Sequence, residues 1–99
     1  MKNYKIIKII DNNNLNFYLD VTSMKDFRIR MSILRGQFRD YLSGLRPYKP
    51  VYDILSGDFS ACVVARNLTS IEEVKQKKDA LNIFYLNKYK NETGASEEE

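Results

Sequence analysis

The sequence contains no histidine, no tryptophan and only one cysteine, Cys62, among its 99 residues. Without histidine the chain has no imidazole to transfer a proton near neutral pH, and one cysteine excludes an internal disulfide framework. Cys62 lies in an apolar run, where a free cysteine is most simply a small buried side chain. The first eight residues lack the long apolar segment of a secretory signal peptide, so we expect an intracellular protein.

Long hydrophobic runs are also missing, and none approaches the roughly 20 residues that a membrane-spanning helix needs. Positive charge predominates, because 16 Lys and Arg residues oppose 13 Asp and Glu residues, for a net charge of +3. Four glutamates lie in the last eight residues, so residues 1–91 carry +7. We therefore divide the chain into one domain, residues 1–91, and an acidic tail, residues 92–99, which has too few apolar groups to order itself. The basic domain favours an anionic partner.

Two apolar runs, Tyr4–Ile10 and Phe17–Thr22, predict a β-hairpin, because Asp and Asn residues separate them. The first run is apolar on both faces, which is typical of a central strand covered on both sides. A third run over residues 59–66 follows the Gly57-Asp58 turn, and we expect it to be buried on both faces as well.

Helical patterns fill the rest of the chain. We expect a helix from Ser23 or Asp26 to about Ser43, ended by Gly44, a short one over residues 51–56, and a last one from a Ser70/Glu73 capping box to about residue 89. The side of the first helix that packs on the sheet should comprise Phe27, Met31, Leu34, Phe38, Tyr41, Leu42 and Leu45. The corresponding side of the last helix should comprise Ile71, Val74, Leu81, Tyr85 and Tyr89.

The remaining sides of the first helix carry two distinct sets of residues. Arg28, Arg35 and Arg39 form a stripe along one flank, whereas Arg30 lies on the other. Ile29 and Ile33 point away from the sheet, where a solvent-facing helix should be polar, so they form a candidate docking patch.

The order of these segments resembles the GIY-YIG nuclease domain, in the short single-domain form found in large DNA viruses. The resemblance covers roughly residues 3–90 and rests on Lys5-Ile6-Ile7, on Tyr18-Leu19-Asp20-Val21-Thr22, on Arg30 to Gly44 without a gap, and on Val51–Leu55, Ser70–Glu73 and Phe84-Tyr85-Leu86. It implies an α+β fold, a three-stranded antiparallel sheet flanked by helices in the order β-β-α-(α)-β-α.

That family, as the resemblance implies, cleaves DNA with two tyrosines, a histidine, an arginine that holds the phosphate and a glutamate that binds a metal ion. This sequence keeps Tyr18 and Arg30 at two of the catalytic positions. The first tyrosine, the histidine and the glutamate are replaced by Ile7, Leu34 and Asn82.

Asn82 shares the helical angle of Ile71 and Tyr85, so we expect it in the packed face of the last helix, where the glutamate of the family would lie. A neutral amide is a poorer ligand for a hard cation than a carboxylate. Tyr18 and Arg30 also have a structural interpretation, Tyr18 as an aromatic of the sheet and Arg30 as the ion-pair partner of Asp20.

The lost groups favour a domain that no longer cleaves, needs no cofactor and serves as a binding or structural module. It would bind DNA or RNA through Arg28, Arg30, Arg35, Arg39, Lys75 and Lys78. Alternatively, Ile29, Ile33 and the acidic tail would dock on a protein partner or a second copy, for instance in a virus particle. A third hypothesis is an active nuclease with Mg²⁺ or Mn²⁺ at Asp20, since Asp79 points elsewhere. We expect the protein in the cytoplasm or nucleus of a host cell, or in the virion.

Overall fold

A computed structural model of the chain describes residues 3–94, and the side chains of residues 3–90. Its elements are β1 (Tyr4–Asp11), β2 (Phe17–Thr22), α1 (Phe27–Leu42), α2 (Val51–Leu55), β3 (Phe59–Leu68) and α3 (Ile71–Gly94). The three strands form one antiparallel sheet in the order β2-β1-β3. The α+β architecture that the sequence predicts is thus confirmed.

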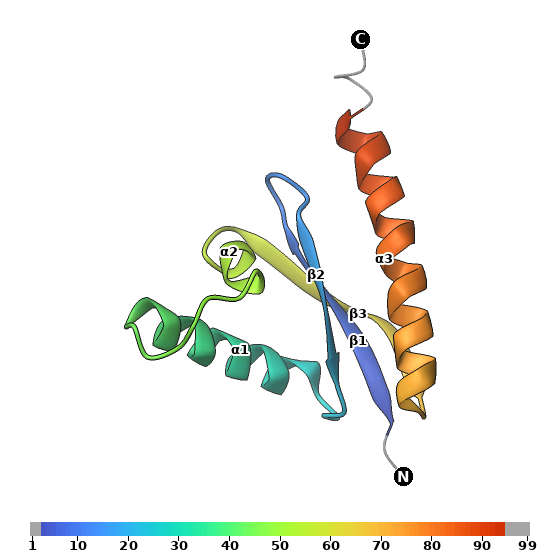
Figure 1. Ribbon diagram of the computed structural model, residues 1–99, viewed down its shortest axis with the longest axis horizontal. Coiled ribbons are helices and arrows are strands. Elements are labelled where there is room, and N and C mark those ends of the chain that lie inside the picture. Colours follow the sequence, from blue (N-terminus) through green and yellow to red (C-terminus); the bar gives the residue numbers. More distant parts are fainter. Residues whose placement is uncertain (1–2, 95–99) are drawn as a thin grey trace.

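The middle strand, β1, is buried on both faces. Ile7 and Ile9 pack against α1 and α2, whereas Ile6 belongs to the cluster on the side of α3, and all three are 0 % exposed. Figure 1 shows α1 and α2 on one side of the sheet and α3 on the other. The two apolar faces of this strand therefore hold the two halves of the core together.

The loop between β1 and β2 is shaped by its polar residues. The Asp11 carboxylate accepts hydrogen bonds from the backbone N–H groups of Asn13 at 2.8 Å and Asn14 at 3.3 Å. Such bonds from an aspartate to the following residues stabilise a turn. Leu15 takes a left-handed conformation with a φ of 63°, which is uncommon for a residue other than glycine. The turn brings β2 back along β1 with Tyr18 opposite Ile9.

The ends of α1 follow local rules. Asp26, not Ser23, caps the helix, because its side chain accepts a hydrogen bond from the Arg28 N–H at 2.9 Å. Gly44 follows the helix with a φ of 81°, a conformation that glycine adopts without strain. α2 then covers the sheet beside α1, and its Tyr52 is 1 % exposed.

The last turn of α1 departs from the predicted packing. Leu42 and Leu45 were expected on the sheet, yet they are 66 % and 79 % exposed. In Figure 1 this end of α1 extends away from the strands, so no sheet lies under it. Tyr41 still packs, because its ring stacks on that of Tyr52 at 5.2 Å.

The third strand, β3, is less buried than its apolar sequence suggests. It pairs with β1 on one side and is the edge of the sheet on the other. Cys62 is exposed, so its predicted burial is wrong, and Val63, Val64 and Ala65 are only partly covered. An edge strand is covered less well than a central one even where its sequence is equally apolar.

The last helix, α3, begins at the predicted cap. The Glu73 N–H donates to the Ser70 hydroxyl at 3.0 Å, but the Glu73 carboxylate accepts from the Thr69 N–H at 2.9 Å instead of that of Ser70. Val74 is buried and Leu81, Tyr85 and Tyr89 are partly buried, whereas Ile71, expected in the packed face, is 61 % exposed.

α3 continues to Gly94, beyond the predicted end near residue 89, so residues 92–94 of the expected tail are helical. The rest of that tail, residues 95–99, lies outside the described residues. None of the described helices has the length and apolar character to cross a membrane.

Candidate functional site

Arg30 and Asp20 form a partly buried ion pair between α1 and β2. Arg30 Nε donates to Asp20 Oδ2 at 2.7 Å, and Arg30 Nη2 donates to Asp20 Oδ1 at 3.2 Å. The side chains of Arg30 and Asp20 are 25 % and 8 % exposed. The hydrogen bond to Asp20 raises the pKa of Arg30, so the guanidinium stays charged. These two hydrogen bonds hold the first turn of α1 against β2.

Tyr18 lies on the same sheet face as this pair, two residues before Asp20. Its pKa is raised above 10, first by burial and then by the negative charge of Asp20. The phenol therefore remains protonated at neutral pH and acts as a hydrogen-bond donor or acceptor rather than as a base.

Ile7 and Leu34, which the resemblance puts at two catalytic positions, are core residues. Ile7 is 0 % and Leu34 is 3 % exposed, and both belong to the hydrophobic cluster under α1 and α2. Neither side chain can move a proton. Their contribution is packing.

Asn82 is exposed, so its predicted place in the packed face is wrong. It lies beside a hollow of about 520 Å³ between the hairpin loop, α2 and the C-terminal half of α3. The polar and aromatic lining comprises Asn14, Asn16, Phe17, Tyr18, Asp53, Asn82, Tyr89 and Lys90. The structure thus brings Tyr18 and Asn82 to one hollow, and Arg30 is not part of its wall. Sequence reasoning missed Asp53 and Lys90, because no local pattern links them to the hairpin.

The residues suggested for a divalent metal do not form a fitting donor set. Both oxygens of Asp20 accept hydrogen bonds from Arg30, and the positive guanidinium disfavours a cation beside this carboxylate. The Asp53 carboxylate accepts a hydrogen bond from the Tyr48 hydroxyl. Within residues 3–94, no three carboxylate, cysteine or histidine side chains gather as metal ligands would.

The arginine stripe, Arg28, Arg35 and Arg39, is exposed along α1 as predicted. Arg28 forms an ion pair with Asp26 at 2.9 Å. In the part of the chain whose side chains are described, no carboxylate lies within ion-pair distance of Arg35 or Arg39. These two guanidinium groups are therefore available to an external anion.

A hollow of about 520 Å³ adjoins this stripe, between α1 and the beginning of β3. Arg28, Ser32, Arg35, Asp58 and Phe59 contribute to its wall. The Arg35 guanidinium lies 5.7 Å from the centre of the Phe59 ring, within cation–π range. Positive charge and an aromatic face meet in this hollow.

The other predicted contact residues lie elsewhere. Lys75 and Lys78 are exposed on α3, which Figure 1 shows across the sheet from α1, so the structure does not bring them to the arginine stripe. Ile29 and Ile33 are 55 % and 37 % exposed, which confirms that they point away from the core.

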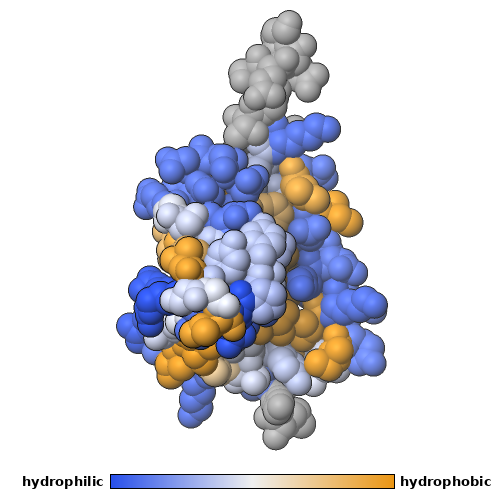
Figure 2. All heavy atoms as spheres, turned by 60° about the vertical axis from the view of Figure 1, so that its left-hand side comes forward, coloured by the Kyte–Doolittle hydropathy of each residue, from blue (hydrophilic) through white to orange (hydrophobic). Residues whose placement is uncertain are grey.

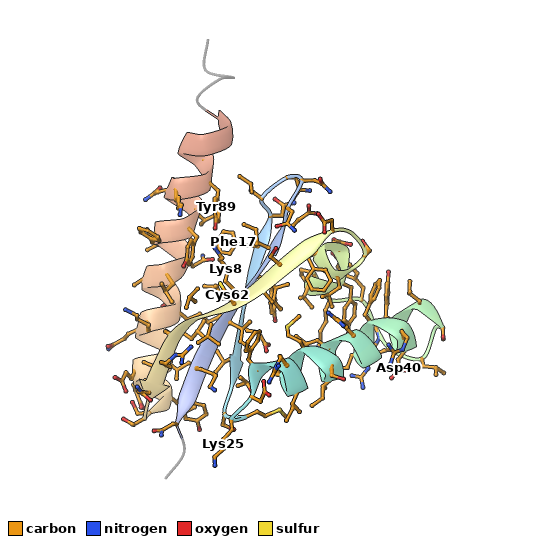
Figure 3. The ribbon with its side chains drawn as sticks, turned by 180° about the vertical axis from the view of Figure 1, so that it is seen from behind. Lys8, Phe17, Lys25, Asp40, Cys62 and Tyr89 are labelled. Atoms are coloured by element: carbon orange, nitrogen blue, oxygen red, sulfur yellow. The ribbon has the colours of Figure 1, made fainter. Side chains whose placement is uncertain are left out.

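A further cluster escaped the sequence analysis. Lys8 projects from β1 toward α3, its Nζ lies 4.4 Å from the centre of the Tyr85 ring, and it donates to the Tyr89 hydroxyl. The Phe17 ring is 5.8 Å from each of these tyrosine rings. Figure 3 shows Lys8, Phe17 and Tyr89 close together. The signal was the alternation Ile6-Lys8-Ile10, which places a lysine in an otherwise apolar face.

Comparisons with known proteins return no match: no family model, no curated protein and no solved structure is similar enough to this chain.

Proposed function

We propose that this chain is a nucleic-acid-binding domain related to the GIY-YIG nucleases, one that no longer cleaves and that contacts phosphates through the arginine stripe of α1. The observation that carries the proposal is the exposure of Arg35 and Arg39 on one flank without a carboxylate neighbour among the described side chains. Arginine binds phosphate through two parallel hydrogen bonds, so Arg35 and Arg39 on one helix flank can contact neighbouring phosphates, and Arg28 joins them if it exchanges Asp26 for a phosphate.

The hollow beside the stripe favours a single strand over a duplex. In this hollow an unpaired base would stack on Phe59 in place of the Arg35 guanidinium that lies over the ring, and Arg35 would then contact the adjacent phosphate. Stacking on an aromatic ring contributes about 1–3 kcal/mol per base and tolerates any sequence. The sequence contains no base-reading motif, so we expect binding to be largely independent of sequence.

The proposed loss of cleavage rests on three replacements. Ile7 and Leu34 are core residues, and Asn82 offers a neutral amide. Arg30, the remaining arginine of the family pattern, is engaged by Asp20. Hydrolysis of a phosphodiester needs charge neutralisation at the phosphate and a deprotonated nucleophile, and neither requirement is met by these side chains.

The test measures binding of the full chain to labelled single-stranded and duplex oligonucleotides over a series of salt concentrations. We expect tighter binding to the single strand, and on duplex DNA a log–log salt slope of about −3, since each neutralised phosphate contributes about −0.9. The variant with Arg28, Arg35 and Arg39 changed to Gln should lose binding. Supercoiled plasmid incubated with the protein and Mg²⁺ or Mn²⁺ should stay intact.

The matched control changes Lys75, Lys77 and Lys78 on α3 to Gln, which removes the same amount of charge on the other side of the sheet. It should weaken binding only slightly, through the loss of long-range attraction. An equal loss in both triple variants would mean that net charge, and not the stripe, holds the nucleic acid. Plasmid nicking that disappears in Arg30→Ala would overturn the loss of cleavage.

A further inference from the structure

The outer side of α1 is apolar where a solvated helix should be polar. Ile29 and Ile33 lie one turn apart on it, and both remain exposed because the opposite side of the helix packs on the sheet. Figure 2 shows hydrophobic side chains among hydrophilic ones on the lower part of the molecule, at the height of α1. Nothing among the described residues 3–94 covers these two isoleucines.

Gly36 continues the same stripe, seven residues after Ile29, with Ser32 beside it. Glycine is unfavourable in the interior of a helix, yet nothing in the described part of the chain requires a glycine at this position. Its φ is not in the left-handed region, and an added Cβ would meet only the flexible end of Arg39 at 3.9 Å. A glycine here is explained if another backbone approaches closely from outside.

The two ends of this surface carry opposite charges. Lys25 precedes α1 and is exposed, and Asp40 is exposed in its last turn, where its carboxylate forms a long ion pair with Arg46 at 3.9 Å. Figure 3 labels both residues at opposite ends of the helix. Lys25 and Asp40 therefore place one positive and one negative side chain at opposite ends of the apolar centre.

We propose that α1 pairs with α1 of a second copy of this chain, antiparallel about a two-fold axis that passes between Ser32 and Ile33. In this register Ile29 lies against the partner's Gly36, Ile33 lies against the partner's Ser32, and Lys25 meets the partner's Asp40. Each contact occurs twice, because a two-fold interface uses the same surface on both copies. Large residues face small ones and opposite charges meet at both ends, so this helix surface is complementary to itself.

The pairing has a consequence for the arginine stripe. A two-fold axis that runs perpendicular to both helices leaves equivalent flanks on the same side of the pair, so the two stripes form one basic face. The pairing itself does not rest on nucleic-acid binding, whereas the joint basic face does rest on the proposed function. The contact is limited to one helix, which spans about 24 Å over its 16 residues. Stable dimers generally bury about 800 Å² per partner, and one short helix supplies less than that. We therefore expect weak association, strengthened when both copies bind one strand.

The test is sedimentation of the full chain over a wide range of concentrations without nucleic acid. We expect a monomer–dimer equilibrium. Gly36→Leu should weaken it at least about tenfold because the larger side chain blocks close approach, and it should raise the melting temperature of the monomer because leucine favours the helix. The double variant Ile29→Lys and Ile33→Lys should be a folded monomer at all concentrations.

Charge reversal tests the register. Lys25→Glu and Asp40→Lys should each weaken dimerisation by about tenfold, because two exposed ion pairs per dimer become repulsive, and their combination should restore it. Lys78→Glu on α3 is the control and should have little effect. A chain that is monomeric at every concentration would overturn the proposal. So would a dimer that resists these changes but is lost in Ile83→Lys on α3, since another surface would then join the copies.

Discussion

The two faces of the sheet are covered to different extents. On the side of α1 and α2, eight buried residues form one cluster, whereas the side of α3 has four, Ile6, Leu19, Leu68 and Val74. α3 also leaves Ile83, Phe84 and Leu86 more than half exposed. A central strand that is apolar on both faces therefore does not imply that both faces of the sheet are covered equally well. Local opening should require less free energy on the side of α3.

The strongest test of this difference uses two neighbours in β1. Ile7 and Ile6 are both 0 % exposed but face opposite layers. Replacement of a buried isoleucine by alanine costs about 2–5 kcal/mol, depending on how far the surroundings can collapse. We expect Ile7→Ala near the top of this range and Ile6→Ala near the bottom, measured by denaturant unfolding. Equal losses would mean that α3 holds its face as firmly as α1 does.

A smaller effect is expected at the ion pair on the α1 side. Arg30→Gln leaves the Asp20 carboxylate, 8 % exposed, without its partner, which should cost about 1–3 kcal/mol of unfolding free energy. Arg28→Gln removes a guanidinium from the solvent-exposed pair with Asp26 and should have little effect.

The double variant Asp20→Asn and Arg30→Gln should recover part of the loss, because no charge is then buried alone. If Arg30→Gln lowered the unfolding free energy as little as Arg28→Gln, the Arg30–Asp20 pair would contribute little to the stability of the α1 side.

The smallest effect concerns the cap of α1. The hydrogen bonds from Arg28 lower the pKa of Asp26 to about 2, compared with about 3.9 in an unfolded chain. The contribution of Asp26 is therefore complete above about pH 4 and is lost as the pH falls through about 2. Asp26→Asn keeps a capping oxygen but does not titrate.

We expect the stability difference between the natural chain and Asp26→Asn to shrink between pH 4 and pH 2, followed by circular dichroism. A difference that stays constant over this interval would show that the charge of Asp26 does not act in the folded state.

Local features were predicted well because neighbouring residues determine them. The strand Phe17–Thr22, the cap at Asp26 and the turn at Gly44 follow from Asn, Asp and Gly at fixed places in the chain. The outward direction of Ile29 and Ile33 follows from helical periodicity, and the pairing of Arg30 with Asp20, weighed as one interpretation of the sequence, is present in the structure.

The candidate site was predicted less well. Its residues were placed by helical angle. The angle gives the direction of a side chain but does not say which other element that side chain meets. Asn82 shares the helical angle of Ile71, and both are exposed at the margin of the packed side. There Asn82 lines a hollow, while Leu81 and Tyr85 beside it pack against the core. The lining residues Asp53 and Lys90 come from α2 and the end of α3, far from Tyr18 in sequence. Such proximity depends on the orientation of the helices relative to the sheet. No local pattern in the sequence specifies that orientation.

The sequence by itself determined which residues share a face of each element, because the periods of strand and helix are set by backbone geometry. It also indicated the turns and limited the cap of α1 to Ser23 or Asp26, because these features depend on side chains a few residues apart. Only the tertiary structure decided which faces pack against another helix or strand. Cys62 is exposed on β3 despite its apolar neighbours in sequence, and Leu42 is exposed because α1 extends beyond the sheet. Burial depends on the neighbours that long-range packing supplies, and periodicity carries no information about those neighbours.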